Sequence, residues 1–272
     1  MSERRGFDPF NFLFGIGLVL VGLYMLAPII FVIINSFNSA AYNVFPPEGF
    51  SLRWYANALS VPKFRSAFVN SIIVALGAMI LSLVLGTMAA RALVRHRFMG
   101  KTFLRSFFFA PVLVPRIALG AALFLMYIRV GLYGGLPGLV IAHSLLGLPF
   151  VISIMTAVMY SIDPSQEEAA QDLGCAPLET FFRVTLPQLR TGLIVAGLFA
   201  FMMSFDELET SLFLVRPENN TMPIEMFLYV QEWQNPTLAA LSTMLIGLTV
   251  ILVLLLIPVL KTQETRKLMS RR

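Results

Sequence analysis

The sequence predicts an all-α, polytopic protein that crosses a membrane six times. Apolar residues make up 57% of the 272-residue chain and charged residues only 13%, and the mean hydropathy is +0.79. A soluble domain carries about a quarter charged residues, so this composition is typical of a membrane protein. Long uncharged stretches separated by short polar segments supply the spans, since about 20 apolar residues cross a hydrocarbon core.

The first span is predicted from Phe12 to Ile34, with a kink at Pro28. We expect it to be retained, because a signal peptide has an apolar region of only about 7–15 residues. In the polar connection that follows, Ser51–Leu59 predicts a short amphipathic helix at the membrane surface. It carries Trp54 and Tyr55, whose rings favour headgroup depth.

The remaining five spans are predicted at Ser66–Ala90, Phe103–Ile128, Leu139–Ile162, Thr191–Val215 and Leu238–Leu260. The third contains a lone Arg116. The fifth is expected to run through Asp206, Glu207 and Glu209, because its uncharged part covers only about 22 Å of a hydrocarbon core of about 30 Å.

The distribution of basic residues predicts the orientation. With six spans, fourteen of the twenty Lys and Arg residues fall on the side that holds both termini, and five fall on the other side. Cytoplasmic loops are enriched in Lys and Arg, so both termini are expected in the cytoplasm. The predicted organisation is an N-terminal tail, first helix and external loop (1–65), a five-helix core (66–260) and a basic cytoplasmic tail (261–272).

The cytoplasmic segment 163–187, between spans four and five, is polar but has the signals of an ordered element. Asp163 is a suitable N-cap, and Pro164 suits the first helical position. Gly174 supplies a C-terminal stop. These signals predict a helix of about ten residues, and a second short helix is expected from Pro177.

The same segment resembles the EAA loop of binding-protein-dependent ABC importer permeases of type I, the MetI-like class. Its pattern reads Glu168-Ala169-Ala170, three residues, Gly174, nine residues, Val184-Thr185-Leu186-Pro187. Only Val184 departs from it, where the family usually has Ile. The resemblance implies a MetI-like core, in which the loop couples the permease to an ATPase through Glu168, Ala169, Ala170, Gly174, Leu186 and Pro187.

The residue types suit such a docking role. Ala169 and Ala170 remove side-chain bulk, so another surface can approach the helix closely. Glu168 and Asp172 repel each other at a spacing of four residues, which favours a basic partner surface.

No ATPase motif is expected on this chain. Gly100-Lys101-Thr102 ends like a phosphate-binding loop, but Arg95 stands where the first glycine is needed. The resemblance therefore implies that ATP and Mg are bound by separate ATPase subunits and that this chain binds no cofactor. It also implies a second, related permease as hetero-partner, an extracytoplasmic substrate-binding protein, membrane lipid around the spans, no nucleic acid, and a place in the bacterial inner membrane.

Three segments resemble the polyamine branch of the family, and this implies a small cationic substrate. They are RHRFMGKTFL (residues 95–104), Leu148–Phe150 and SFDELETSLF (residues 204–213). Charged groups inside a span face a partner or a cavity. Two hypotheses stay open for Asp206, Glu207, Glu209 and Arg116: an ion pair that braces two spans, or contact with substrate in the pathway.

Other functions and sites remain as alternatives. His143 is a single histidine in span four with no second ligand in pattern, so no metal site is predicted. A secondary transporter or channel, a membrane scaffold, and an ABC permease for opine, amino-acid or phosphonate-type substrates are the alternative functions. Transport that survives removal of the ATPase favours the secondary transporter or channel. Tolerance of neutralised intramembrane acids, with no substrate dependence, favours the scaffold.

Overall fold

The computed structural model describes the backbone of residues 9–269 and the side chains of residues 13–254. Within this range the chain is helical, and the one extended pairing there is an isolated bridge between Asn38 and Phe50. The predicted all-α class is confirmed. Arg4 and Arg5, which contribute to the predicted orientation, lie outside the described residues, as do the last three residues of the basic tail.

The helical elements in chain order are α1 (Pro9–Ser36), α2 (Arg53–Ser60), α3 (Pro62–Arg95), α4 (Lys101–Leu113), α5 (Arg116–Val130), α6 (Leu136–Tyr160), α7 (Ser165–Asp172), α8 (Pro177–Thr180), a π-helical turn (Phe181–Thr185), α9 (Leu186–Gln188), α10 (Arg190–Phe205), α11 (Ser211–Leu214), a 3₁₀ turn (Pro217–Asn219), α12 (Met222–Glu232) and α13 (Thr237–Met269). In the described range, α1, α3, α6 and α13 are each long and apolar enough to cross a membrane. Counting two bent helix pairs as one span each gives up to six.

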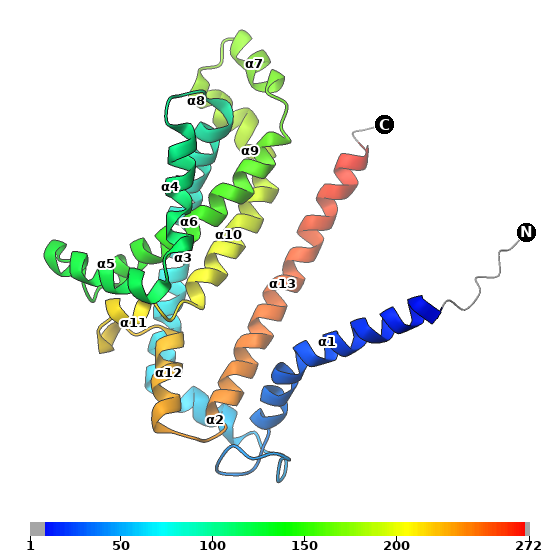
Figure 1. The fold of residues 1–272 in the computed structure, drawn as a ribbon, viewed down its shortest axis with the longest axis vertical. Helices are drawn as coiled ribbons and strands as arrows, with labels where there is room; N and C mark the ends of the chain where they lie inside the picture. Colours follow the sequence, from blue (N-terminus) through cyan, green and yellow to red (C-terminus); the bar gives the residue numbers. More distant parts are fainter. Residues whose placement is uncertain (1–8, 270–272) are drawn as a thin grey trace, which may run out of the picture. The chain divides into compact units, whose positions relative to one another are not determined.

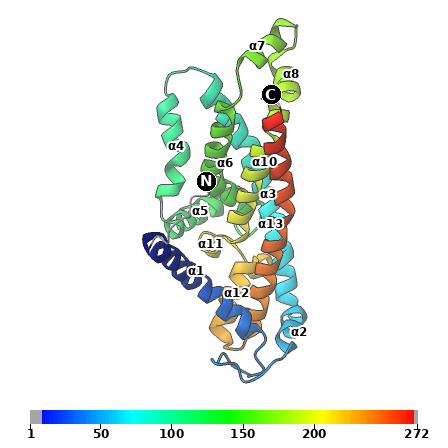
Figure 2. The ribbon, with the colours of Figure 1, turned by 90° about the vertical axis from the view of Figure 1, so that its right-hand side faces the viewer.

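The chain forms two compact units. The larger holds Pro62–Leu228 and the end of α13 from Val259, and the smaller is formed by α1 and the chain from there to Val61 together with Tyr229–Pro258. In the larger unit, α3, α6 and α10 run side by side (Figures 1 and 2) and enclose a core that includes Val151, Met155 and Ala196. Small residues let these helices approach closely.

Span three departs from the prediction, because it is two helices rather than one. Helices α4 and α5 meet at 104°. Pro115 disfavours a helical conformation at the residue before it, and Val114 is extended, with φ −87° and ψ 130°. The chain turns there and restarts as a helix at Arg116. The lone arginine therefore lies at a helix start and not inside a continuous span.

The prediction that span five continues as a helix through the acidic residues is also wrong. Helix α10 ends at Phe205, and the chain through Asp206, Glu207 and Glu209 is non-helical before α11. Side-chain to backbone hydrogen bonds in this connection, described below, replace the helical ones. At its other end α10 follows the Pro177–Gln188 helix at a bend of 75°.

In the smaller unit, buried polar groups order the connection between α1 and α2. The Trp54 indole Nε1 donates to the backbone oxygen of Asn38 at 2.9 Å. A short helix is present as α2 where Ser51–Leu59 predicted one. From α2, the Asn57 amide donates to the Thr237 hydroxyl at the start of α13, at 2.8 Å.

Candidate functional site

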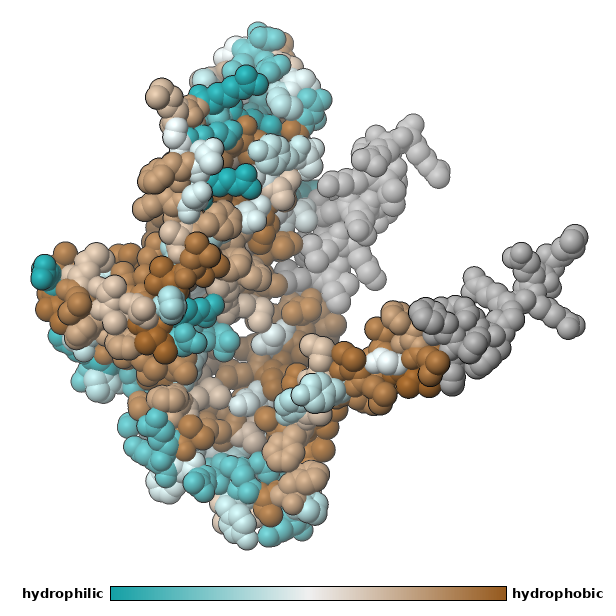
Figure 3. All heavy atoms as spheres, in the orientation of Figure 1, coloured by the Kyte–Doolittle hydropathy of each residue, from teal (hydrophilic) through white to brown (hydrophobic). Residues whose placement is uncertain are grey.

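Segment 163–187 forms the polar end of the larger unit, where hydrophilic atoms gather over α7 and α8 (Figures 1 and 3). The Asp163 carboxylate accepts the backbone N–H of Ser165 at 3.0 Å. This bond lowers the pKa of Asp163 below its ordinary value. Gly174 has φ +94°, and the Cys175 N–H donates to the Ala170 carbonyl at 3.1 Å, as in a Schellman motif. The predicted start and stop signals are therefore confirmed.

A buried glutamate holds this segment to the end of α3. Arg95, the last residue of α3, places its Nε 3.1 Å from Oε1 of Glu167. The Thr185 hydroxyl donates to the same carboxylate oxygen at 3.0 Å. Arg95 also donates to the Ile162 carbonyl at 3.0 Å. We call Arg95, Glu167 and Thr185 the loop clasp, because it joins α3, α7 and the π-helical turn.

Arg91 adds a second attachment one helical turn earlier on α3. Its guanidinium lies 4.5 Å from the centroid of the Phe181 ring, which is a cation–π geometry. Its Nη2 donates to the Pro177 carbonyl at 3.4 Å. Residues four apart share a helix face, so Arg91 and Arg95 together bind both halves of the segment to one helix.

The residues predicted to contact an ATPase lie mostly on the outside of the segment. Glu168, Ala169, Gly174 and Pro187 are exposed, and Ala170 and Leu186 are half-buried. Three large apolar side chains also point outward: Leu173, Leu178 and Phe182, with exposed fractions of 88%, 68% and 56%. Exposed apolar groups on a polar end are typical of an interaction surface.

Arg116 and Glu207 form a close ion pair, with Nη1 and Oε2 2.7 Å apart. Glu207 is buried, and its other oxygen accepts the Thr210 N–H at 2.9 Å. The Thr210 hydroxyl in turn donates to the Arg116 carbonyl at 3.4 Å. This pair ties the start of α5 to the non-helical connection after α10. Of the three predicted acids, Arg116 therefore contacts Glu207.

Asp206 and Glu209 differ from Glu207, because both are exposed. Neither carboxylate has an ion-pair partner among the described side chains. The connection between α10 and α11 therefore carries two exposed carboxylates, Asp206 and Glu209, on either side of Glu207, whose charge is paired with Arg116. Within the same described range, no group of three or more His, Cys, Asp or Glu residues has the arrangement of a metal site.

His143 is buried and contacts two serines that the sequence did not predict as its partners. Its Nδ1 lies 2.8 Å from the Ser204 hydroxyl, and its Nε2 lies 2.8 Å from the Ser211 hydroxyl. The Ser211 hydroxyl donates to the Glu207 carbonyl at 3.0 Å, so it accepts from His143, whose proton is on Nε2. The Ser204 hydroxyl then donates to Nδ1. The ring bridges the end of α10 and the start of α11.

Sequence reasoning missed Glu167 and His143 for the same reason. Each is a single polar residue whose partners come from distant parts of the chain, and spacing along one helix does not reveal them. The available signals were weak: two adjacent glutamates at the start of α7, and a histidine in an otherwise apolar span.

Comparison with known proteins gives a consistent family. The family described as "Binding-protein-dependent transport system inner membrane component" matches residues 82–263. The putrescine transport system permease protein PotI of Escherichia coli K12 is 33% identical over 238 residues, 85% of this chain and 84% of PotI. The spermidine/putrescine transport system permease protein PotC of the same strain is 27% identical over 85% of this chain and 87% of PotC.

More distant relatives extend over nearly the whole chain. The sulfate transport system permease protein CysT of Salmonella typhimurium is 25% identical over 93% of this chain and 92% of CysT. Among solved structures, a chain of a bacterial ABC transporter that imports the acidic polysaccharide alginate matches with a TM-score of 0.72. It is 22% identical and covers 96% of this chain and 99% of its own length. At that identity the match supports the fold alone.

Proposed function

This chain belongs to the family of binding-protein-dependent transport system inner membrane components, as a multi-pass permease subunit of an ABC importer, and we propose that it forms one half of the translocation pathway. A second, related permease forms the other half, and a soluble substrate-binding protein delivers the solute from outside. Separate ATPase subunits bind ATP and Mg. The permease lies in the bacterial inner membrane with both termini in the cytoplasm.

The observation that carries the coupling role is the loop clasp. Arg95 and Glu167 join segment 163–187 to α3 through a largely buried ion pair, so a displacement of that segment is transmitted to the packed α3, α6 and α10. The outward face, with Glu168 and the apolar Leu173, Leu178 and Phe182, is the surface offered to the ATPase. Movement of the ATPase then moves the spans.

We further propose a polyamine or a similar small cation as the substrate. Two observations support a cationic substrate. PotI and PotC are named for putrescine and spermidine transport, and the carboxylates of Asp206 and Glu209 are exposed in this chain. Arg116 neutralises Glu207, which makes that pair a brace. The two neighbouring acids remain free to attract a cation.

The direct test is to reconstitute the permease pair with its ATPase and binding protein in liposomes. We expect putrescine or spermidine, with the binding protein, to stimulate ATP hydrolysis and to accumulate inside the vesicles. Stimulation by an opine, an amino acid or a phosphonate instead would redirect the substrate assignment. Uptake that continues without the ATPase would contradict the importer proposal and favour a secondary transporter or channel.

A further inference from the structure

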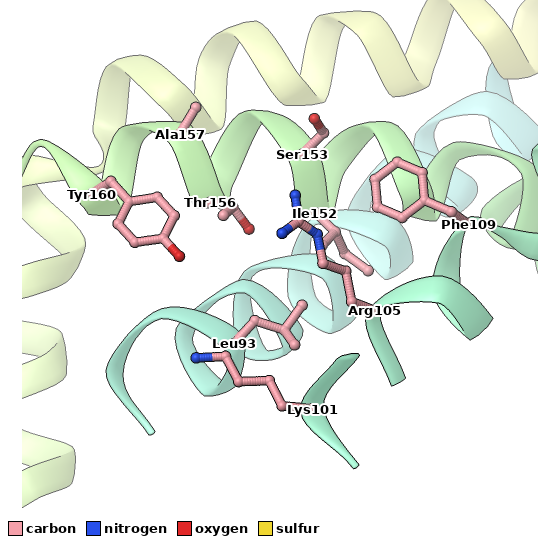
Figure 4. Close-up of a pocket in the computed structure, with 9 residues that line it drawn as sticks. All are labelled: Leu93, Lys101, Arg105, Phe109, Ile152, Ser153, Thr156, Ala157 and Tyr160. Carbon is pink, nitrogen blue, oxygen red and sulfur yellow. The ribbon is translucent and has the colours of Figure 1, made fainter. Parts of the chain in front are cut away.

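A basic pocket lies between the end of α3, the first turns of α4 and the last turns of α6. Its volume is about 280 Å³. Its lining includes Lys101, Arg105 and Phe109 from α4, and Ile152, Thr156 and Tyr160 from α6. Figure 4 shows the Arg105 guanidinium and the hydroxyls of Thr156 and Tyr160 turned toward the same space.

The positive charge of this pocket is not compensated by the described side chains. Arg105 takes part in none of their ion pairs, and Lys101 makes one hydrogen bond, from Nζ to the His96 carbonyl at 3.3 Å. An ammonium group has three donors, so donors remain free. Helix α4 also begins here with no acidic residue in its first turn and no side-chain cap, which adds a favourable field for an anion.

Thr156 adds a hydroxyl to the lining of the pocket. Its hydroxyl oxygen is buried and has no hydrogen-bond partner among the described groups. Solvent does not reach this oxygen, so a ligand is held by the charged groups. Lys101 and Arg105 together present donors of the kind that bind a phosphate.

The rest of the surroundings favour a lipid over a soluble anion. Phe109 and Ile152 form an apolar wall beside the basic groups. On α4, Phe103 and Phe107 are 74% and 60% exposed, and their rings stack with centroids 6.3 Å apart. A polar phosphate site next to exposed apolar surface matches a phospholipid, whose headgroup and acyl chains are adjacent. Basic pockets between cytoplasmic helix ends are known to bind anionic headgroups.

We propose that this pocket binds the phosphate of an anionic phospholipid in the cytoplasmic leaflet. The inference rests on the proposed membrane orientation, which places the connection from α3 to α4 at the cytoplasmic surface. A bound lipid bridges α4 and α6. The cationic substrate proposed above is repelled by Lys101 and Arg105, so this site is distinct from the solute pathway.

The test uses the full chain, purified, delipidated and titrated with phosphatidylglycerol or phosphatidylcholine under native mass spectrometry. We expect phosphatidylglycerol to bind in preference. The double variant K101Q/R105Q lowers its affinity on the order of tenfold. Arg97→Gln, which removes an exposed charge from the same connection outside the pocket, leaves the affinity within about twofold. The charge-conserving K101R/R105K variant retains binding and controls for folding.

Several outcomes overturn the proposal. An equal loss of phosphatidylglycerol affinity in the Arg97→Gln and K101Q/R105Q variants would attribute binding to general surface charge and not to the pocket. Displacement of the lipid by millimolar inorganic phosphate assigns the pocket to a soluble anion. Exclusion of the lipid from the assembled complex shows that a partner subunit covers the pocket. Because lipid binding is read without transport, a complex that imports solute but binds no phosphatidylglycerol rejects this inference and leaves the proposed function intact.

Discussion

At the residue scale, Glu167 and Glu168 are neighbours in the chain with opposite surroundings. Glu167 is buried against Arg95 and Thr185, whereas Glu168 is exposed. Successive helical residues point about 100° apart, so one faces α3 and the other faces outward. The glutamate of the family motif is thus free to contact a partner because the preceding one secures the loop.

We predict that Glu167→Gln destabilises the chain by about 3 kcal/mol, because it leaves the Arg95 guanidinium largely buried without its counter-charge. The measurement is thermal unfolding of the purified variant. Glu168→Gln is the matched control, since it removes the same charge from an exposed site and should stay within about 0.5 kcal/mol. Equal stability of the two variants would show that the clasp contributes nothing.

A second residue-scale prediction concerns the free acids. The double variant D206N/E209Q should lower uptake of putrescine at least severalfold, because it removes two exposed carboxylates that attract a cation. Uptake into liposomes is compared with the amount of assembled complex, which should be unchanged. Unchanged uptake would remove these acids from the substrate pathway.

For Glu207→Gln, by contrast, we expect a loss of assembled complex, because the ion pair between the buried Glu207 and Arg116 is lost.

At the element scale, the packing of α3 against α6 depends on the absence of a side chain. A Cβ atom built at Gly86 lies 2.6 Å from the Val151 side chain, closer than such atoms pack. At Gly86, α3 therefore has no room for a side chain unless Val151 of α6 moves.

We predict that Gly86→Ala lowers stability by about 1–3 kcal/mol through this overlap, and that adding Val151→Ala restores most of the loss. Thermal unfolding of the single and double variants measures both effects. Gly22→Ala in α1 is the control, since a Cβ there meets nothing within 4 Å. A loss at Gly22 equal to that at Gly86 would attribute the effect to a cause other than the α3–α6 contact.

The broken elements show where local patterns failed. Pro115 was visible in the sequence, but a proline inside a span is compatible with either a kink or a break. The structure has a break, with Arg116 of the new helix held by Glu207. The end of α10 at Phe205 depends likewise on Glu207 and on the bridge through His143. The contacts of Arg116 with Glu207 and of His143 with Ser204 and Ser211 join residues 61 to 91 positions apart, so no local pattern contains them.

At the scale of the whole molecule, the single cysteine gives a test of orientation. Cys175 follows α7 and is half-buried, and we place it in the cytoplasm. A membrane-impermeant maleimide should label it in inverted vesicles and leave it unlabelled in intact spheroplasts. For the opposite side, Cys175→Ser combined with Glu48→Cys should give the reverse pattern, because Glu48 is exposed in the connection between α1 and α2. Labelling of Cys175 in spheroplasts would invert the proposed topology.

The sequence by itself determined the all-α membrane class, most of the apolar helices, the start and stop of α7 and the family. These follow from composition, from the length of uncharged runs and from short-range capping, all of which act within a few residues. Only the tertiary structure decided that Glu167 secures the loop, that Arg116 pairs with Glu207, and that His143 bridges Ser204 and Ser211. The physical reason is that a buried polar group takes whichever partner the packing brings within hydrogen-bonding distance, and that partner is set by the path of the whole chain.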